Sequence, residues 1–254
     1  MAQLFKPSAN TLARASSVLA AALPVVAIVV GSQITRSPAN TGVEIPLEQP
    51  VPFSHKHHAY ELGIDCRYCH TGVEETGFAG LPQTETCMTC HSQIWTNSPL
   101  LDPVRQSYQT GKPIEWTLVN KAPEFVYFNH SIHIDRGVSC NHCHGPVTEM
   151  QITWKGKPFQ MAWCLECHTQ PEKYLYEDPE AAARGMSPRQ QVFNLYLKKQ
   201  SDPKGQKMTP QEQQLIHGGE QKTSVAELIK RGNELLKERG VKKDQLADCT
   251  VCHH

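Results

Sequence analysis

The ten cysteines of the 254-residue chain form five pairs, and every pair has the same spacing. A histidine directly follows each pair, so the chain contains five Cys-x-x-Cys-His motifs and no further cysteine. In c-type haem attachment, two thiols at this spacing bond to the porphyrin and the next residue, histidine, binds the iron. The sequence therefore predicts five covalently bound haems c. Motifs 1 to 5, in chain order, are Cys66/Cys69/His70, Cys87/Cys90/His91, Cys140/Cys143/His144, Cys164/Cys167/His168 and Cys249/Cys252/His253.

Three other uses of paired cysteines fit this pattern less well. A Cys₄ zinc site needs no histidine after each pair. A disulfide framework has no use for that histidine either. A redox-active Cys-x-x-Cys is expected once in a chain, not five times.

A second ligand on each iron is needed if the haems are electron carriers, because a six-coordinate iron has no open position for a substrate. Residues 53–58 and 128–133 both read Phe-x-His-x-x-His, and motifs 1 and 3 follow these two copies. Histidines three residues apart on a helical turn share one face and can reach two different haems. The repeat thus predicts four distal iron ligands: His55, His58, His130 and His133.

The fifth distal ligand is predicted to be a methionine, since thioether ligation also occurs in cytochromes c. Met161 lies three residues before Cys164, and Met150 is the alternative. The remaining histidines are expected at the surface or in solvent: His57, His142 and His217. The role of His254 stays open, because it directly follows a proximal ligand at the last position.

The repeat organises the chain into two dihaem units and a separate fifth motif. In each unit a second motif follows the first, after 21 residues from Cys66 to Cys87 and after 24 from Cys140 to Cys164. The expected segments are an N-terminal stretch 1–14, an apolar span 15–34, a linker 35–50, dihaem unit 1 at 51–95, a connector 96–125, dihaem unit 2 at 126–175, a helical segment 176–245 and the fifth motif at 246–254.

The apolar span 15–34 carries no charge and has the length that crosses a bilayer core. Lys6 and Arg14 precede it and Arg36 follows it, which weakly favours a cytoplasmic N-terminus. The sequence therefore predicts a single-pass protein of the cytoplasmic membrane with its haem region on the periplasmic side. A cleaved signal peptide is the alternative, and it too would export the haem region.

Composition favours a mainly α fold with long loops, built around haems. Only 39% of the residues are hydrophobic, which is a thin supply for a core unless haems fill the interior. Three capping boxes predict helix starts at Ser187, Thr209 and Ser224. The last of these helices should bury an apolar face of Val225, Leu228, Ile229, Leu235 and Leu236. The formal net charge is zero, so nothing indicates a nucleic-acid partner.

Several longer stretches resemble the membrane-anchored pentahaem cytochrome of alternative complex III. They include SANTLAR, PVPFSHKHH, GIDCRYCHTGVE, FAGLP, TCMTCHSQIW, FVYFNHSIH, CHGPV and MAWCLECH. The resemblance covers almost the whole chain, with one departure, since His254 stands where that family has a basic residue after the last motif. The Phe-x-His-x-x-His pattern is also similar to the small tri- and tetrahaem cytochromes of sulfate reducers.

The resemblance implies an electron-transfer protein of a larger complex, without catalytic residues of its own. Its partners would be an iron–sulfur protein, quinol-binding membrane subunits and a monohaem cytochrome c, and electrons would leave toward a periplasmic carrier or a terminal oxidase. A free-standing quinol dehydrogenase cytochrome is an alternative. A multihaem reductase is a weaker one, because no Cys-x-x-Cys-Lys variant occurs and the histidines suffice to close every iron.

Overall fold

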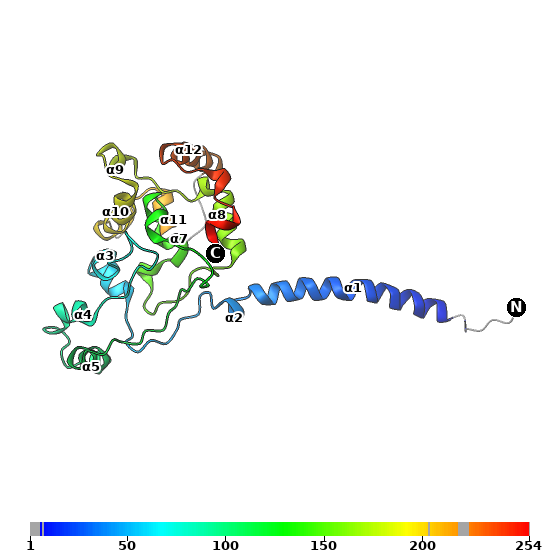
Figure 1. The fold of residues 1–254 in the computed structure, drawn as a ribbon, viewed down its shortest axis with the longest axis horizontal. Helices are drawn as coiled ribbons and strands as arrows, with labels where there is room; N and C mark the ends of the chain where they lie inside the picture. Colours follow the sequence, from blue (N-terminus) through cyan, green and yellow to red (C-terminus); the bar gives the residue numbers. More distant parts are fainter. Residues whose placement is uncertain (1–5, 7, 203, 218–223, 254) are drawn as a thin grey trace. The chain divides into compact units, whose positions relative to one another are not determined.

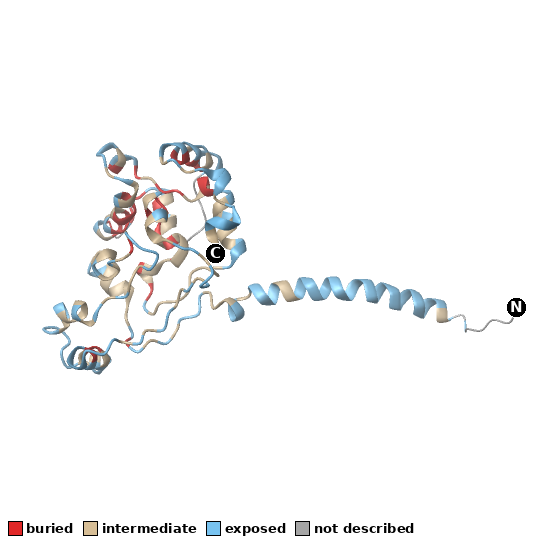
Figure 2. Cartoon of the chain, viewed as in Figure 1, coloured by how far each residue is buried: buried red, intermediate tan, exposed pale blue. Residues whose placement is uncertain are grey.

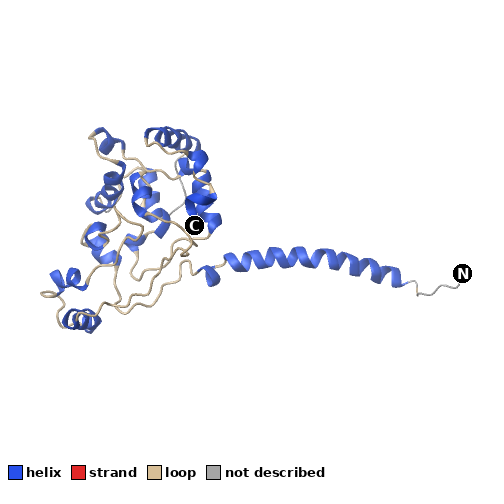
Figure 3. Ribbon diagram, viewed as in Figure 1, coloured by secondary structure: helices blue, strands red, loops and turns tan. Residues whose placement is uncertain are grey.

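The computed structural model describes residues 6, 8–202, 204–217 and 224–253. The chain divides into two compact units, Met1–Val43 and Glu44–His254, called here unit 1 and unit 2. The prediction of a mainly α fold with long loops is confirmed (Figure 3). Within the described residues there is no extended strand, and the β-type pairing consists of isolated bridges such as Val138–Leu175.

Unit 1 is dominated by one long apolar helix, α1 (Ser8–Arg36), followed by the short α2 (Pro38–Thr41). The helix has 29 residues, so it extends beyond the predicted span 15–34 at both ends. At 1.5 Å per residue it is about 43 Å long, more than a bilayer core requires. None of its residues is buried by protein (Figure 2). By length and composition it is able to cross a membrane, as the sequence predicts.

The first part of unit 2 consists of short helices (Figure 1). These helices are η1 (Lys56–Glu61), α3 (Cys66–Cys69), α4 (Thr84–His91), η2 (Pro99–Leu101), α5 (Asp102–Thr110), α6 (His130–Asp135), α7 (Cys140–His144), η3 (Val147–Glu149), α8 (Met161–Thr169) and η4 (Pro171–Lys173). Six of them, η1, α3, α4, α6, α7 and α8, contain residues of the Cys-x-x-Cys-His motifs or of the His repeats.

The second part of unit 2 holds the longer helices expected between residues 176 and 245, and then the fifth motif. Its helices are α9 (Pro179–Ala183), α10 (Pro188–Ser201), α11 (Pro210–His217), α12 (Val225–Glu238), η5 (Lys243–Gln245) and α13 (Cys249–Cys252).

The apolar core of unit 2 lies around α10. Val192, Phe193 and Leu195 on this helix pack with Tyr176 and Ile216 in one buried cluster. Cys66 and Cys140, the first cysteines of motifs 1 and 3, pack against the same cluster. The core therefore supports the start of both dihaem units.

A smaller cluster forms where α12 meets η4. Leu235 and Leu236 pack with Val138 and Leu175, so this part of the predicted apolar face is buried. Val225 is 54% exposed, which corrects its assignment to that face, because it is the first residue of the helix. Gly232 lies so close to η4 that a Cβ there would collide with the backbone of Glu172.

Two of the three predicted capping boxes are present. Ser187 and Gln190 exchange both hydrogen bonds at the start of α10. Thr209 and Glu212 do the same before α11. At the third, α12 begins after Ser224 as predicted, but the side chain of Ser224 makes no capping hydrogen bond to the helix.

Candidate haem-binding site

Each Cys-x-x-Cys-His motif forms about one helical turn, which places its two thiols on one face. At motif 1 the Asp65 carboxylate accepts a hydrogen bond from the Arg67 amide and fixes the start of the turn. All ten cysteines are free thiols, so the disulfide alternative is wrong for this structure. Among the described residues, no three His, Cys, Asp or Glu side chains are grouped to hold a metal ion, as a zinc site would require.

Four histidines of the repeats each face the histidine of one motif. The ring centroids of His55 and His70 are 6.4 Å apart, with the ring planes at 7°. His58 and His91 are separated by 6.2 Å at 62°. The second dihaem unit repeats the arrangement. The ring centroids are 6.3 Å apart for His130 and His144, with planes at 14°, and 6.1 Å apart for His133 and His168, with planes at 33°.

These separations fit one iron between the two rings of each pair. A metal–imidazole bond is about 2 Å long, so two imidazoles on opposite sides of one metal have centroids about 6.3 Å apart. Rings in direct contact would lie closer together. Phe53 and His58, for example, have centroids 4.4 Å apart. The four pairs thus have the spacing of bis-histidine ligation.

Hydrogen bonds at Nδ1 orient most of these rings. Nδ1 of His70 donates to the Gly80 carbonyl at 2.8 Å, and Nδ1 of His168 donates to the Leu246 carbonyl at 2.8 Å. Among the repeat histidines, His58 and His133 donate to backbone carbonyls one turn earlier, at 2.9 and 2.8 Å. A donor at Nδ1 fixes the tautomer that leaves the Nε2 lone pair for a metal.

A phenylalanine orients both histidines of each repeat. Phe53 lies edge-on to His55 and nearly parallel to His58, at interplanar angles of 87° and 23°. Phe128 lies at 86° to His130 and 28° to His133. The same three-ring arrangement recurs 75 positions later, from Phe53 to Phe128, so the sequence repeat is also a structural repeat.

Burial keeps several of these imidazoles neutral. It lowers the pKa of His55 to about 4, assisted by the nearby His70. It also lowers the pKa of His144 to about 4, with His130 and His70 contributing. The neutral imidazole is the form that binds a metal. Burial raises the pKa of Cys143 to about 12, so that thiol is protonated at neutral pH.

The other described histidines do not face a motif histidine. Nδ1 of His57 lies 2.9 Å from a carboxylate oxygen of Glu61, and the side chain is partly exposed, as expected. His217 is not simply solvated, because Glu149 binds its Nδ1 at 2.6 Å and Lys199 contacts its Nε2 at 3.0 Å.

His142 does not simply face outward. Its ring lies 4.5 Å from Tyr174 and 6.4 Å from Trp163. Burial lowers its pKa to about 4. The position between two motif cysteines gave no sign of this packing. His254 lies outside the described residues.

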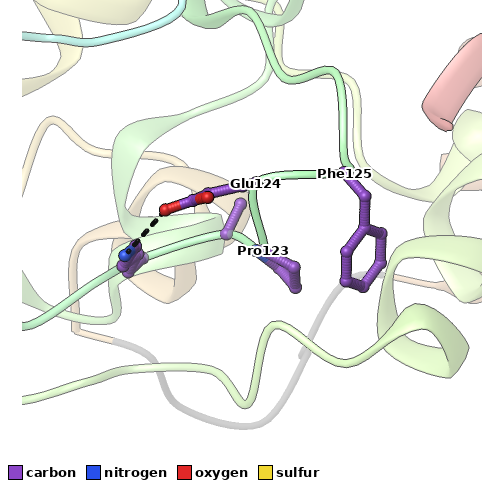
Figure 4. Close-up of a pocket in the computed structure, with 5 residues that line it drawn as sticks. Pro123, Glu124 and Phe125 are labelled. Carbon is purple, nitrogen blue, oxygen red and sulfur yellow. Dashed lines mark ion pairs between the residues drawn. The ribbon is translucent and has the colours of Figure 1, made fainter. Parts of the chain in front are cut away.

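Motif 5 has a different neighbour from the other four. Its His253 faces the Phe125 ring, with centroids 5.8 Å apart and planes at 26°. Phe125 lines an open hollow of about 450 Å³ formed by residues 121–125, where Lys121 and Glu124 form an ion pair at 3.6 Å (Figure 4).

The two candidate methionines differ in exposure. Met161 is the first residue of α8 and is 64% exposed. Met150 is buried, and its carbonyl accepts a hydrogen bond from the Lys56 amide beside His55. Met150 is therefore packed next to the first histidine repeat.

Comparisons with known proteins agree with this chemistry. Residues 95–215 match the cytochrome c552 model, and residues 31–100 match the class III cytochrome c model. The chain is 39% identical over 98 residues to the multihaem cytochrome c subunit of a menaquinone reductase from Nitratidesulfovibrio vulgaris. That stretch covers 38% of this chain and 46% of the relative, less than half of either. This chain is thus a mostly helical multihaem cytochrome c that takes part in electron transport.

Proposed function

We propose that the chain is a membrane-anchored pentahaem cytochrome c that conducts electrons within a quinol-oxidising respiratory complex of the alternative complex III type. α1 anchors it in the cytoplasmic membrane, and unit 2 carries the haems on the periplasmic side. The ten motif cysteines attach five haems c. The five motif histidines are the proximal iron ligands.

The observation that carries the proposal is the set of four histidine pairs at 6.1 to 6.4 Å. His55, His58, His130 and His133 are the distal ligands of motifs 1, 2, 3 and 4, in the order His70, His91, His144 and His168. Irons closed on both sides exchange electrons but bind no substrate. This supports a role in electron transfer over the role of a reductase.

The fifth haem is assigned Met161 as its distal ligand, with His253 on the other side. Met161 is exposed at the start of α8. On the same helix, burial and the nearby motif 5 cysteine Cys252 raise the pKa of the motif 4 thiol Cys164. Thioether ligation raises the potential relative to bis-histidine ligation, so this haem would be an acceptor within the chain.

A second candidate function follows from the menaquinone reductase relative. In such a complex the electrons would run toward the quinone, opposite to the direction proposed above. The residues of this chain would be the same in both cases, because a row of haems conducts in either direction. The partner subunits decide the direction: an iron–sulfur protein, quinone-binding membrane subunits and a monohaem cytochrome c are expected.

Mild-detergent purification of the complete chain with its haems tests the proposal. Mass spectrometry should find five haems bound, partner subunits should co-purify, and the preparation should oxidise quinol. Spectra should contain low-spin haem. A large ligand-binding high-spin fraction would contradict the role of a conductor. Quinone reduction without quinol oxidation would favour the second candidate, and quinol oxidation by the isolated chain would favour a free-standing dehydrogenase.

A further inference from the structure

Motifs 1 and 2 are neighbours within the first dihaem unit. The Tyr68 hydroxyl, inside motif 1, lies 2.8 Å from the Thr89 hydroxyl, inside motif 2. His55 and His58, which face the two motif histidines, lie one turn apart.

Among the described residues, motif 1 makes the contact between the two dihaem units that the hydrogen bonds and the core cluster show. His130, which faces motif 3, donates from Nδ1 to the Gly77 carbonyl at 2.8 Å, and its amide donates to the Thr76 carbonyl at 3.3 Å. Both carbonyls belong to the loop that follows motif 1. Cys66 and Cys140 pack against one core cluster. Motif 1 therefore adjoins motif 3.

Motifs 3 and 4 are neighbours within the second dihaem unit. His144 lies 6.1 Å from the Phe159 ring, which is 5.2 Å from the Trp163 ring beside Cys164.

Motif 4 then reaches motif 5. Nδ1 of His168 donates to the Leu246 carbonyl, three residues before Cys249.

From these contacts we infer that the five haem sites, each numbered as its motif, lie in the spatial order 2–1–3–4–5. This differs from their order in the sequence. The inference rests on the proposed haem ligation. Sites 2 and 5 are the ends of the row, so they exchange electrons with partner proteins. Sites 1, 3 and 4 connect the two ends.

Two observations that are independent of these contacts agree with sites 2 and 5 as ends. Of the ten cysteines, the two that are exposed are Cys90 of motif 2 and Cys249 of motif 5. Figure 1 also shows α4, which carries motif 2, and α13, which carries motif 5, at opposite sides of unit 2. An exposed haem edge is where a partner approaches closely enough for electron transfer.

Iron positions in the complete, haem-loaded chain test the order directly, by anomalous diffraction or cryo-electron microscopy. Of the two irons in the second dihaem unit, that of site 3 should lie nearer to site 1. The iron of site 5 should have the iron of site 4 as its nearest neighbour. A site 2 iron lying between two others, or a site 5 iron nearest to site 1 or 2, would overturn the order. If mass spectrometry finds fewer than five haems, the proposed function fails. If five haems are bound but the irons lie in another order, only this inference fails.

Matched variants give a second test in solution. His130→Met and His58→Met each replace an imidazole by a thioether and raise the potential of one iron, at site 3 or site 2. The potential is set so that the altered iron is reduced and diamagnetic together with the Met-ligated site 5, whereas in the unaltered chain at the same potential only site 5 is reduced. Compared with the unaltered chain, site 1 should then show slower electron-spin relaxation in both variants, because it adjoins both altered sites. Site 4 should respond only to His130→Met. Unchanged relaxation of site 1 in His130→Met would contradict the contact between sites 1 and 3.

Discussion

At the residue scale, the ring-plane angles of the histidine pairs predict distinguishable spectra. The planes of His55 and His70 are 7° apart, whereas those of His58 and His91 are 62° apart. Strongly twisted imidazoles bring the iron d orbitals closer in energy, so site 2 should give the most anisotropic low-spin EPR signal. His58→Met should remove this signal. His55→Met is the control and should remove a signal of ordinary rhombicity instead. Loss of the same signal in both variants would contradict the assignment.

The assignment of Met161 is testable by potential and by spin state. Met161→His should lower one haem potential, by on the order of 0.1–0.3 V within the roughly 0.8 V that axial ligands span. Met161→Leu, which removes the ligand atom, should convert one haem to high spin. Redox titration followed optically, with EPR on the same samples, measures both effects. If neither variant changes any haem, Met161 is not a ligand.

Residue spacing was enough to propose which histidines serve the haems, but not how they combine. His55 and His58 share a helical face whichever motif each one meets. The structure brings the first histidine of each repeat to the motif that directly follows it, and the second to the next motif. Which motif histidine each repeat histidine meets depends on how loops distant in the sequence pack together, and a three-residue spacing does not determine this packing. The pairing of Phe125 with His253 had no signal in the sequence.

At the scale of elements, helix starts were more predictable from the sequence than helix contacts. The residue pattern of a capping box is local, and for Ser187 and Thr209 the local geometry follows it. Ser224 has the same pattern, yet its side chain makes no hydrogen bond to α12. Side-chain orientation at a helix start depends on the chain that enters it, which the four-residue pattern does not describe.

This difference predicts unequal effects of two matched substitutions. Ser187→Ala removes a side-chain cap and should lower the free energy of unfolding by about 1 kcal/mol. Ser224→Ala removes no such hydrogen bond and should change it by less than about 0.5 kcal/mol. Denaturant unfolding of the haem-loaded protein measures both. Equal losses would mean that Ser224 caps its helix in solution.

The close approach of α12 to η4 was also hidden in the sequence. An apolar stripe predicts that a face is buried, but not that Gly232 lies against the Glu172 backbone. Gly232→Ala should therefore destabilise the protein by about 1–3 kcal/mol through overpacking, although alanine is the better helix former. Asn233→Ala, at the neighbouring exposed position, is the control and should be nearly neutral. A more stable Gly232→Ala variant would show that α12 can move away from η4.

At the scale of the whole molecule, composition predicted the fold class because short apolar segments cannot build a large core. The two clusters centred on α10 and on α12 leave the motif helices with little apolar contact of their own. The spatial order of the haem sites could not be predicted in this way, because no residue pattern indicates that site 1 rather than site 2 adjoins site 3. The junction is a hydrogen bond from His130 to Gly77, 53 residues apart. Contacts of this kind form only when the chain has folded.

Haem removal should therefore cost the protein its tertiary structure. Without iron between them, paired rings such as His130 and His144 lose the atoms that hold them 6.3 Å apart, and buried imidazole nitrogens lose their ligand bonds. The chain produced without the haem-attachment machinery should lose its near-ultraviolet circular dichroism and unfold without a cooperative transition. Part of its helical signal should remain, because α1 makes its backbone hydrogen bonds internally. The haem-loaded chain, produced in parallel, should melt cooperatively. A cooperative transition in the haem-free chain would show that the clusters around α10 and α12 are sufficient to fold unit 2.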